Sequence, residues 1–282
     1  MSRSQRLILA LAVLTTALVG IVPGRAQTLA QFHTPVGDML VELYDQEKPV
    51  TVQNFLRYVN SDRYNDMYMH RWVPGFVVQG GGFITTNRHT AVATLAPLPV
   101  FPAITNEYSV GRTFGNQFGS IAMARVGGLT NSATSQWFFN LGNNSGLDTV
   151  DGGFTVFGQV RAGTNVLTRF NTVTVANGIY ALNLGSPLDQ LPVLSQTPGY
   201  EDLIYTKITL QSRPVVGISA RLDGARIVRW NSLSNLVNIV EMAPQISGAW
   251  STLVSTNGTG ASMETVDTTP GAGPRFYRVR IQ

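Results

Sequence analysis

Hydrophobic and polar positions follow recognisable periods over the first two thirds of the chain. Residues 39–44 alternate with a period of two, which predicts a strand, and the apolar residues of 52–59 recur at helical spacing, which predicts a helix. A second short helix is expected around 166–170. An apolar run covers 70–79 and is interrupted by Pro74-Gly75, and further strands are predicted at 120–124, 136–141, 154–160 and 203–210. Many strands with only two helices predict a mainly β, mostly antiparallel fold.

Two other stretches depart from this pattern. Residues 83–106 are rich in Thr, Ala and Pro without clear periodicity, so we expect a long loop there. After Arg213-Pro214 the composition becomes rich in Ser, Thr, Asn and Gly, with strand-like runs at 227–230, 237–241 and 276–280. We therefore expect a domain boundary near residue 213, followed by a small all-β, sandwich-like module over 215–282.

The N-terminus has the parts of an export signal. Arg3 and Arg6 precede an apolar run over 7–22, and the small residues Gly24 and Ala26 precede Gln27 as they would at a cleavage site. The run is shorter than the roughly 20 residues that a stable membrane span needs. We expect residues 1–26 to be a removed signal peptide and the mature chain to lie in the periplasm, in the cell envelope or outside the cell. A retained membrane anchor is the alternative.

Charge and composition exclude several classes of protein. The chain has 20 basic and 16 acidic residues, but three of the arginines lie within 1–26, so nucleic-acid binding is not expected. The absence of cysteine excludes disulfides and a thiolate nucleophile. The three histidines are far apart in the sequence, so no metal site is expected. After residue 26 we expect no stable insertion into a membrane.

Three sequence motifs follow one another between residues 69 and 160. They are MHRWVPGFVVQGG at 69–81, GSIAMAR at 119–125 with NSATSQWFFNL at 131–141, and LD at 147–148 with GGFTVFGQV at 152–160. In order and spacing they resemble the signature of cyclophilin-type peptidyl-prolyl isomerases. The resemblance covers about residues 28–212. It implies a closed eight-stranded antiparallel barrel that is capped by the two predicted helices.

The resemblance also implies an activity, the cis-trans isomerisation of X-Pro bonds in exported proteins, with proline-containing polypeptides as partners. Rotation about the amide meets a barrier of about 18–20 kcal/mol, and twisting leaves a lone pair on the prolyl nitrogen. Arg71 matches the family's catalytic arginine, whose fixed positive charge stabilises the twisted amide and not the planar one. The reaction needs neither metal nor cofactor. Without the motif, Arg71 would be read as an arginine in a surface ion pair.

The same resemblance assigns substrate-binding residues. An apolar seat for the proline ring is expected from Phe76, Met123, Phe138 and Leu147, although the plain alternative is that all four are core residues. Gln79 and Gln136 would hydrogen-bond the substrate backbone. The expected substrate-binding groove is completed by Val77, Ala124, Arg125 and Phe154. The side chain of Arg125 lies either along the groove or in solvent.

Departures from the family pattern leave other functions open. Residues 82–106 replace the family's loop after Q-G-G, and Gly146 stands where cyclosporin-sensitive members carry Trp, so weak cyclosporin binding is expected. Asp148 and Asp151 could pair as acid and base or bind calcium, but their spacing fits no known ligand loop and we expect a solvated turn. The alternative functions are a catalytically weak module that binds proline-containing segments, and a surface-binding protein. In either case 215–282 would contact an envelope or surface partner.

Overall fold

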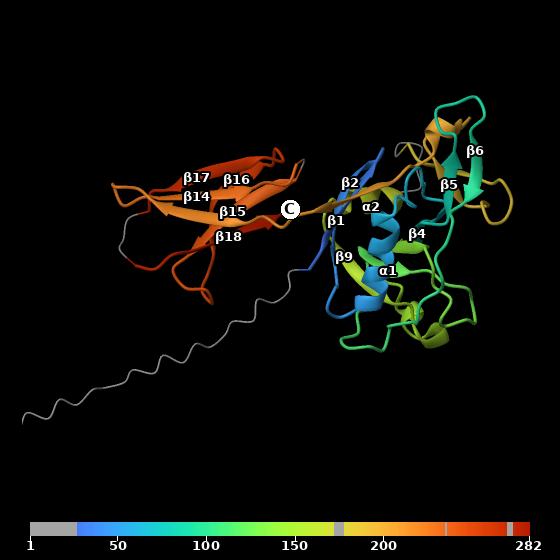
Figure 1. The fold of residues 1–282 in the computed structure, drawn as a ribbon, viewed down its shortest axis with the longest axis horizontal. Coiled ribbons are helices and arrows are strands. Elements are labelled where there is room, and N and C mark those ends of the chain that lie inside the picture. Colours follow the sequence, from blue (N-terminus) through green and yellow to red (C-terminus); the bar gives the residue numbers. More distant parts are fainter. Residues whose placement is uncertain (1–26, 172–177, 235, 270–272) are drawn as a thin grey trace, which may run out of the picture.

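The computed structural model describes residues 27–171, 178–234, 236–269 and 273–282 (Figure 1). The expected signal peptide, 1–26, lies outside these residues. In the described part of the chain, no helix has the length and hydrophobicity to cross a membrane. Strands dominate and two α-helices accompany them, so the predicted mainly β fold is confirmed.

An eight-stranded antiparallel sheet curls around the core of the first part of the chain, in the order β12-β1-β2-β9-β7-β8-β4-β3. Among the described residues its outer strands do not pair as a ladder. The segments before them meet at a bridge between Tyr68 and Tyr205, beside a 3.0 Å bond from the Met69 N–H to the Ile204 carbonyl. A continuous closed barrel is therefore not confirmed. The strands are β1 (Leu29–Thr34), β2 (Gly37–Leu43), β3 (Arg71–Val73), β4 (Val77–Gly80), β7 (Ser120–Met123), β8 (Trp137–Asn140), β9 (Val156–Ala162) and β12 (Lys207–Gln211).

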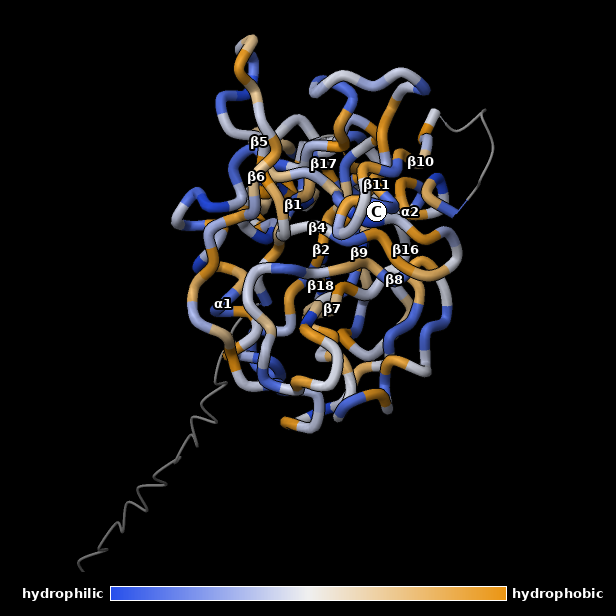
Figure 2. The backbone as a smooth tube through the Cα atoms, turned by 90° about the vertical axis from the view of Figure 1, so that its right-hand side faces the viewer, coloured by the Kyte–Doolittle hydropathy of each residue, from blue (hydrophilic) through white to orange (hydrophobic). Residues whose placement is uncertain are grey.

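Both predicted helices pack on this sheet. Helix α1 (Pro49–Asn60) has a proline in its first turn, where the missing N–H costs nothing, and it buries Val52, Phe55 and Tyr58. Helix α2 (Thr164–Asn171) buries Val166, Leu167 and Phe170. Alternate strand residues complete the same core, and hydrophilic positions are frequent in the outer loops (Figure 2).

The long loop expected over 83–106 is wrong in part. Strands β5 (Phe83–Thr86) and β6 (Thr94–Pro97) form a hairpin there, with a 2.6 Å hydrogen bond between the hydroxyls of Thr86 and Thr94. Threonine suits a pleated strand but does not register as apolar, so this pair was missed. A second hairpin pairs β10 (Tyr180–Leu182) with β11 (Leu191–Val193).

The C-terminal residues form two three-stranded sheets, β13-β14-β17 and β16-β15-β18. The three predicted strand runs are confirmed as β14, β15 and β18. Buried Trp230 and Val240 belong to different sheets but to one apolar cluster. The bounds are β13 (Val216–Ala220), β14 (Arg226–Asn231), β15 (Val237–Ala243), β16 (Ser251–Asn257), β17 (Ser262–Asp267) and β18 (Phe276–Ile281).

Candidate active site

One row of paired residues crosses five strands of the large sheet. Arg71 of β3 pairs with Gln79 of β4, and Gln79 pairs with Phe138 of β8. Phe138 then pairs with Ala122 of β7, which pairs with Val156 of β9. Directly opposed residues of antiparallel strands project from the same face. The register therefore brings Arg71 and Gln79 onto the face that carries the apolar residues Phe138, Ala122 and Val156.

An apolar surface cluster covers this face and forms the candidate seat for a proline ring. Phe138 is 4% exposed, and its ring meets that of Phe154 edge-on with 5.9 Å between centroids. Partly exposed residues pack on the buried ones, which leaves apolar surface for a ligand. The buried members are Tyr44, Val77, Ala122, Phe138 and Val156, and the partly exposed ones are Phe76, Phe114, Ala124, Leu147 and Phe154.

Six of the predicted substrate-binding residues therefore lie together: Phe76, Val77, Ala124, Phe138, Leu147 and Phe154. Met123 does not join them, and we correct that expectation. It is 2% exposed and belongs to the interior cluster, because neighbouring strand residues point to opposite faces and Ala122 occupies the outer one.

Arg71 lies beside the seat with its donors available. Its guanidinium carbon is 6.0 Å from the centroid of the Phe76 ring, and the residue is half-buried. Within the described part of the chain, its side chain has no hydrogen-bond or ion-pair partner. A charged group without a protein partner next to an apolar surface can meet a polar atom of a bound ligand.

A pair of glutamines lies on the same side as Arg71. The Gln79 Nε2 donates a 2.7 Å hydrogen bond to Gln136 Oε1, and both residues are half-buried. His70, missed in the sequence, lies next to them and is 3% exposed. Burial lowers the pKa of His70 to about 4, although a hydrogen bond with Gln136 opposes the shift. His70 is therefore neutral at pH 7 and adds no charge to the site.

The side chain of Arg125, in contrast, is hydrogen-bonded to other groups of the protein. Its side chain is 2% exposed, so the solvated alternative is wrong. Its Nη2 donates to the carbonyls of Val150 (2.8 Å) and Gly153 (3.3 Å), and the guanidinium lies 4.2 Å from the Phe154 ring centroid. Burial lowers its pKa, which the Asp151 carboxylate 3.7 Å away opposes. Arg125 thus fixes the loop that carries Phe154.

A network of buried amides, missed in the sequence, holds two residues of the seat from behind. Asn144 Nδ2 donates to the Phe76 carbonyl (2.7 Å) and to Asn140 Oδ1 (2.7 Å). Asn140 Nδ2 donates to Asn116 Oδ1 (3.1 Å), and Asn116 Nδ2 donates to the Phe154 carbonyl (3.2 Å). The network therefore connects the backbones of Phe76 and Phe154.

Asp148 belongs to this network and not to a solvated turn, which corrects that expectation. Its Oδ1 accepts hydrogen bonds from the backbone N–H (3.0 Å) and the side-chain amide (2.7 Å) of Asn116. The signal available in the sequence was the spacing of four between Asn140, Asn144 and Asp148, directly beside two of the motifs.

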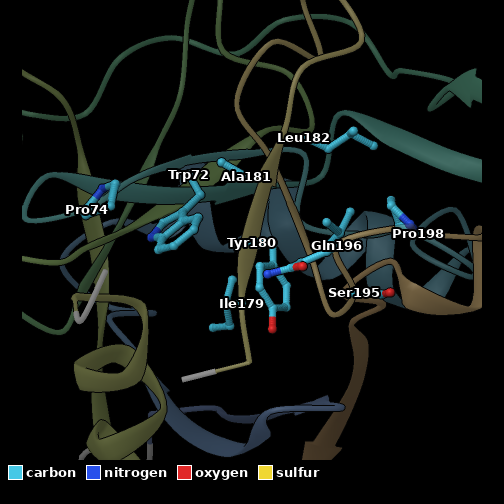
Figure 3. A pocket seen from close by; sticks show the side chains of 10 residues that line it. Trp72, Pro74, Ile179, Tyr180, Ala181, Leu182, Ser195, Gln196 and Pro198 are labelled. Carbon is cyan, nitrogen blue, oxygen red and sulfur yellow. The ribbon is translucent and has the colours of Figure 1, made fainter. Parts of the chain in front are cut away.

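Strand β3 separates the seat from a second groove. Trp72, the neighbour of Arg71, lines a groove of about 520 Å³ together with Pro74, Tyr180 and Pro198 (Figure 3). Its remaining lining residues come from the β10-β11 hairpin and the segment after it, outside the three motifs. As for metals, no group of acidic or histidine side chains suited to an ion occurs among the residues that the structure describes.

Comparisons with known proteins agree with this geometry. Residues 29–191 match the family model of the cyclophilin type peptidyl-prolyl cis-trans isomerases. A peptidyl-prolyl cis-trans isomerase of Acinetobacter baylyi is 35% identical over 172 residues, which are 60% of this chain and 85% of that protein. Peptidyl-prolyl cis-trans isomerase A of Dickeya dadantii is 38% identical over 175 residues, 60% of this chain and 86% of that one.

Among solved structures, a cyclophilin type isomerase of Cryptosporidium parvum superposes with a TM-score of 0.46 at 20% identity, covering 67% of this chain and 99% of that one. The family model alone covers more than half of the chain, over the part that carries the motifs and the candidate seat. The chain therefore belongs to the cyclophilin-type peptidyl-prolyl cis-trans isomerase family.

Proposed function

We propose that this protein catalyses the cis-trans isomerisation of X-Pro bonds, with Arg71 as the catalytic residue. The observation that carries the proposal is the unpartnered guanidinium of Arg71 beside the apolar surface of Phe76, in the row that also contains Gln79 and Phe138. Family membership and the names of the relatives support the same activity.

The seat binds the proline ring and leaves the preceding peptide bond beside Arg71. The apolar walls of Phe76, Leu147 and Phe154 favour the ring over water. Gln79 and Gln136 hydrogen-bond the substrate backbone. The bond between their side chains is then replaced by bonds to peptide groups of the substrate. Binding therefore restrains the residues on both sides of the bond that rotates.

Arg71 lowers the barrier because it interacts with the twisted amide more strongly than with the planar one. When the bond rotates, conjugation is lost and the prolyl nitrogen gains a lone pair that accepts a hydrogen bond from the guanidinium. No covalent bond is formed or broken, and no proton is transferred. By analogy with oxyanion-hole donors, one such interaction contributes about 3–4 kcal/mol to the transition state.

The proposal includes export of the protein and exported clients. The support is the sequence pattern of 1–26, with two arginines, an apolar run and small residues before Gln27. We further propose that 28–212 is the isomerase domain and that its sheet closes into a barrel through the bridge between Tyr68 and Tyr205. The module over 215–282 would then contact an envelope or surface partner.

The test is an exchange measurement on an Ala-Pro peptide with the chain from Gln27 onwards. Wild type should accelerate cis-trans exchange, and Arg71→Ala should lose most of that acceleration. Arg57→Ala is the matched control, because Arg57 also lies over a phenylalanine ring, that of Phe101, but away from the seat. Equal acceleration by wild type and Arg71→Ala would contradict the catalytic role of Arg71. A wild type that binds the peptide without accelerating exchange would favour the alternative function.

A further inference from the structure

Two clusters of one glutamate between two arginines lie outside the apolar cluster of the seat. In the first, the Glu42 carboxylate accepts from Arg161 at 2.6 Å and also from Arg213. In the second, the Glu241 carboxylate accepts from Arg278 at 2.7 Å and from Arg280 at 3.4 Å. The first cluster belongs to the eight-stranded sheet and the segment that follows it, and the second belongs to the C-terminal module.

All four arginines line one cavity of about 500 Å³, which we call the junction groove. Their side chains are 40–50% exposed, whereas those of Glu42 and Glu241 are only 15% and 8% exposed. The guanidinium groups are therefore the accessible part of each cluster, and the carboxylates lie beneath them.

The side-chain charge of the two clusters is positive. Burial raises the pKa of Glu42 and Glu241, but their arginine partners outweigh it and hold both pKa values below the ordinary value. Both carboxylates are thus ionised at neutral pH. Each cluster has two positive charges for one negative charge, so the side chains of the two clusters together have a surplus of two positive charges.

Apolar and polar contacts hold the two sides of the groove together. Leu40 of the large sheet and Leu236 and Ile281 of the module belong to one apolar cluster. The Arg213 Nε donates to the Gln27 carbonyl at 2.9 Å, and Asn231 Nδ2 donates to the Arg213 carbonyl at 3.2 Å. The arginines are therefore presented by a packed junction, which lowers the cost of ordering them around a ligand.

We propose that the junction groove binds an acidic segment of a polypeptide. Planar guanidinium groups match carboxylates in a two-point geometry. The closely spaced phosphates of a nucleic acid would bring negative charges next to Glu42 and Glu241 and be repelled by them. The carboxylates of a peptide can be separated by neutral residues and so contact the arginines alone. The groove lies between the large sheet and the C-terminal module. A recessed groove can admit an extended polypeptide more easily than a flat membrane surface. This site is independent of the prolyl isomerase activity.

The experiment measures binding of a fluorescent peptide of alternating Glu and Ser, without proline, to the chain from Gln27 onwards. The expected result is binding that weakens with salt and is lost for the peptide with Gln in place of Glu. The double variant Arg278→Gln/Arg280→Gln should weaken binding at least tenfold, as should Arg161→Gln/Arg213→Gln. Arg229→Gln is the matched control, because it removes an equally exposed arginine paired with Glu264 on another sheet.

Glu42→Gln separates recognition from damage to the fold, because it raises the surplus charge of the groove and should tighten binding severalfold. A variant that had only lost structure would bind more weakly. Unchanged affinity in both double variants, equal binding of the Glu and Gln peptides, or binding to phosphatidylglycerol vesicles in place of the peptide would overturn the proposal.

Discussion

The two sides of the candidate seat for the proline ring are built in different ways. Its floor consists of strand residues, Val77, Ala122 and Phe138, whose positions follow from the register of β4, β7 and β8. Its wall, Leu147 to Phe154, consists of two short 3-10 turns held by side chains from elsewhere. Backbone ladders fix the floor. The wall has local backbone bonds, such as that from the Phe154 N–H to the Leu147 carbonyl (2.9 Å), and is tied to the rest of the protein by side chains such as Arg125 and Asn116. We therefore expect that replacing a nearby polar residue disturbs the structure of the wall more than that of the floor.

One glycine shows how closely the wall is fitted. Gly153 has φ +80°, and a Cβ there would come within 2.4 Å of the Tyr108 ring. A larger residue would therefore have to displace Tyr108 and adopt a backbone conformation that side chains disfavour. The hydrogen bond from Arg125 to the Gly153 carbonyl reinforces the same turn.

The largest expected effect comes from the floor. Phe138→Ala removes a ring that is 4% exposed, so we expect a loss of about 3–5 kcal/mol in the free energy of unfolding, because the cavity cannot fully collapse. Isomerase activity should fall as well, since the ring is also part of the seat. Urea unfolding measures the first effect. Phe118→Ala, at a partly exposed phenylalanine in a loop, is the control and should cost far less.

A pH effect is expected next to the floor, at His70. Its pKa is about 4 in the folded protein and about 6.5 in the unfolded chain, so the unfolded state binds the proton more strongly. Stability is therefore fully present above pH 6.5 and falls as the pH drops towards 4, by at most about 3 kcal/mol.

His70→Gln should flatten this decline in urea unfolding measured from pH 7 to pH 4. His89→Asn is the control, because His89 is exposed at φ 70°, a conformation that Asn tolerates. An identical pH profile in wild type and His70→Gln would contradict the assignment.

The wall should respond to the loss of one amide. Asn116→Ala removes the amide donor to Asp148 and to the Phe154 carbonyl and leaves Asp148 only the backbone N–H of residue 116, so we expect a loss of about 1–3 kcal/mol in stability and a raised KM. Asn143→Ala changes an exposed asparagine of the neighbouring segment and is the control. If steady-state kinetics gave both variants the same KM, the wall would not depend on the network.

The smallest expected effect is a gain in cyclosporin affinity when residue 146, at the exposed end of the wall, is changed. Gly146 is exposed, and a Cβ there would meet no atom within 4 Å, so Gly146→Trp can be accommodated. A tryptophan adds apolar area and an N–H donor, which should tighten cyclosporin binding about tenfold. Titration calorimetry measures it, with Gly146→Ala as control. If Gly146→Trp did not bind cyclosporin more tightly, the wall would differ from that of cyclosporin-sensitive members at more than this residue.

The contrast between floor and wall also explains what the sequence predicted. Each motif consists of short uninterrupted runs of residues. Arg71, Phe76, Gln79 and Phe138 could therefore be assigned from the resemblance of these runs to the family signature. Met123 was misplaced because a motif does not reveal which face of a strand a residue occupies, and β7 shifts its register against β9 between Ile121 and Ala122.

The polar network was missed for a different reason. Asn116 and Asp148 are distant in the sequence and meet only when the chain is folded, and asparagine is common in ordinary turns. Hairpin β5-β6 was missed because each strand has only four residues, and threonines and a proline interrupt the apolar residues Phe83, Ile84 and Leu95. The resemblance of the motifs therefore predicted residues of the candidate seat and not the contacts that support them.

The two arginines beside the seat provide the most direct test. Arg71 has no hydrogen-bond or ion-pair partner among the described residues, and Arg125 is bound to the loop, so catalysis should depend on the first and positioning on the second. We predict that kcat/KM on an Ala-Pro peptide falls about 10²–10³-fold in Arg71→Ala, mainly through kcat, and much less in Arg125→Ala, mainly through KM. Equal losses in the two variants, or an unchanged kcat in Arg71→Ala, would contradict the account.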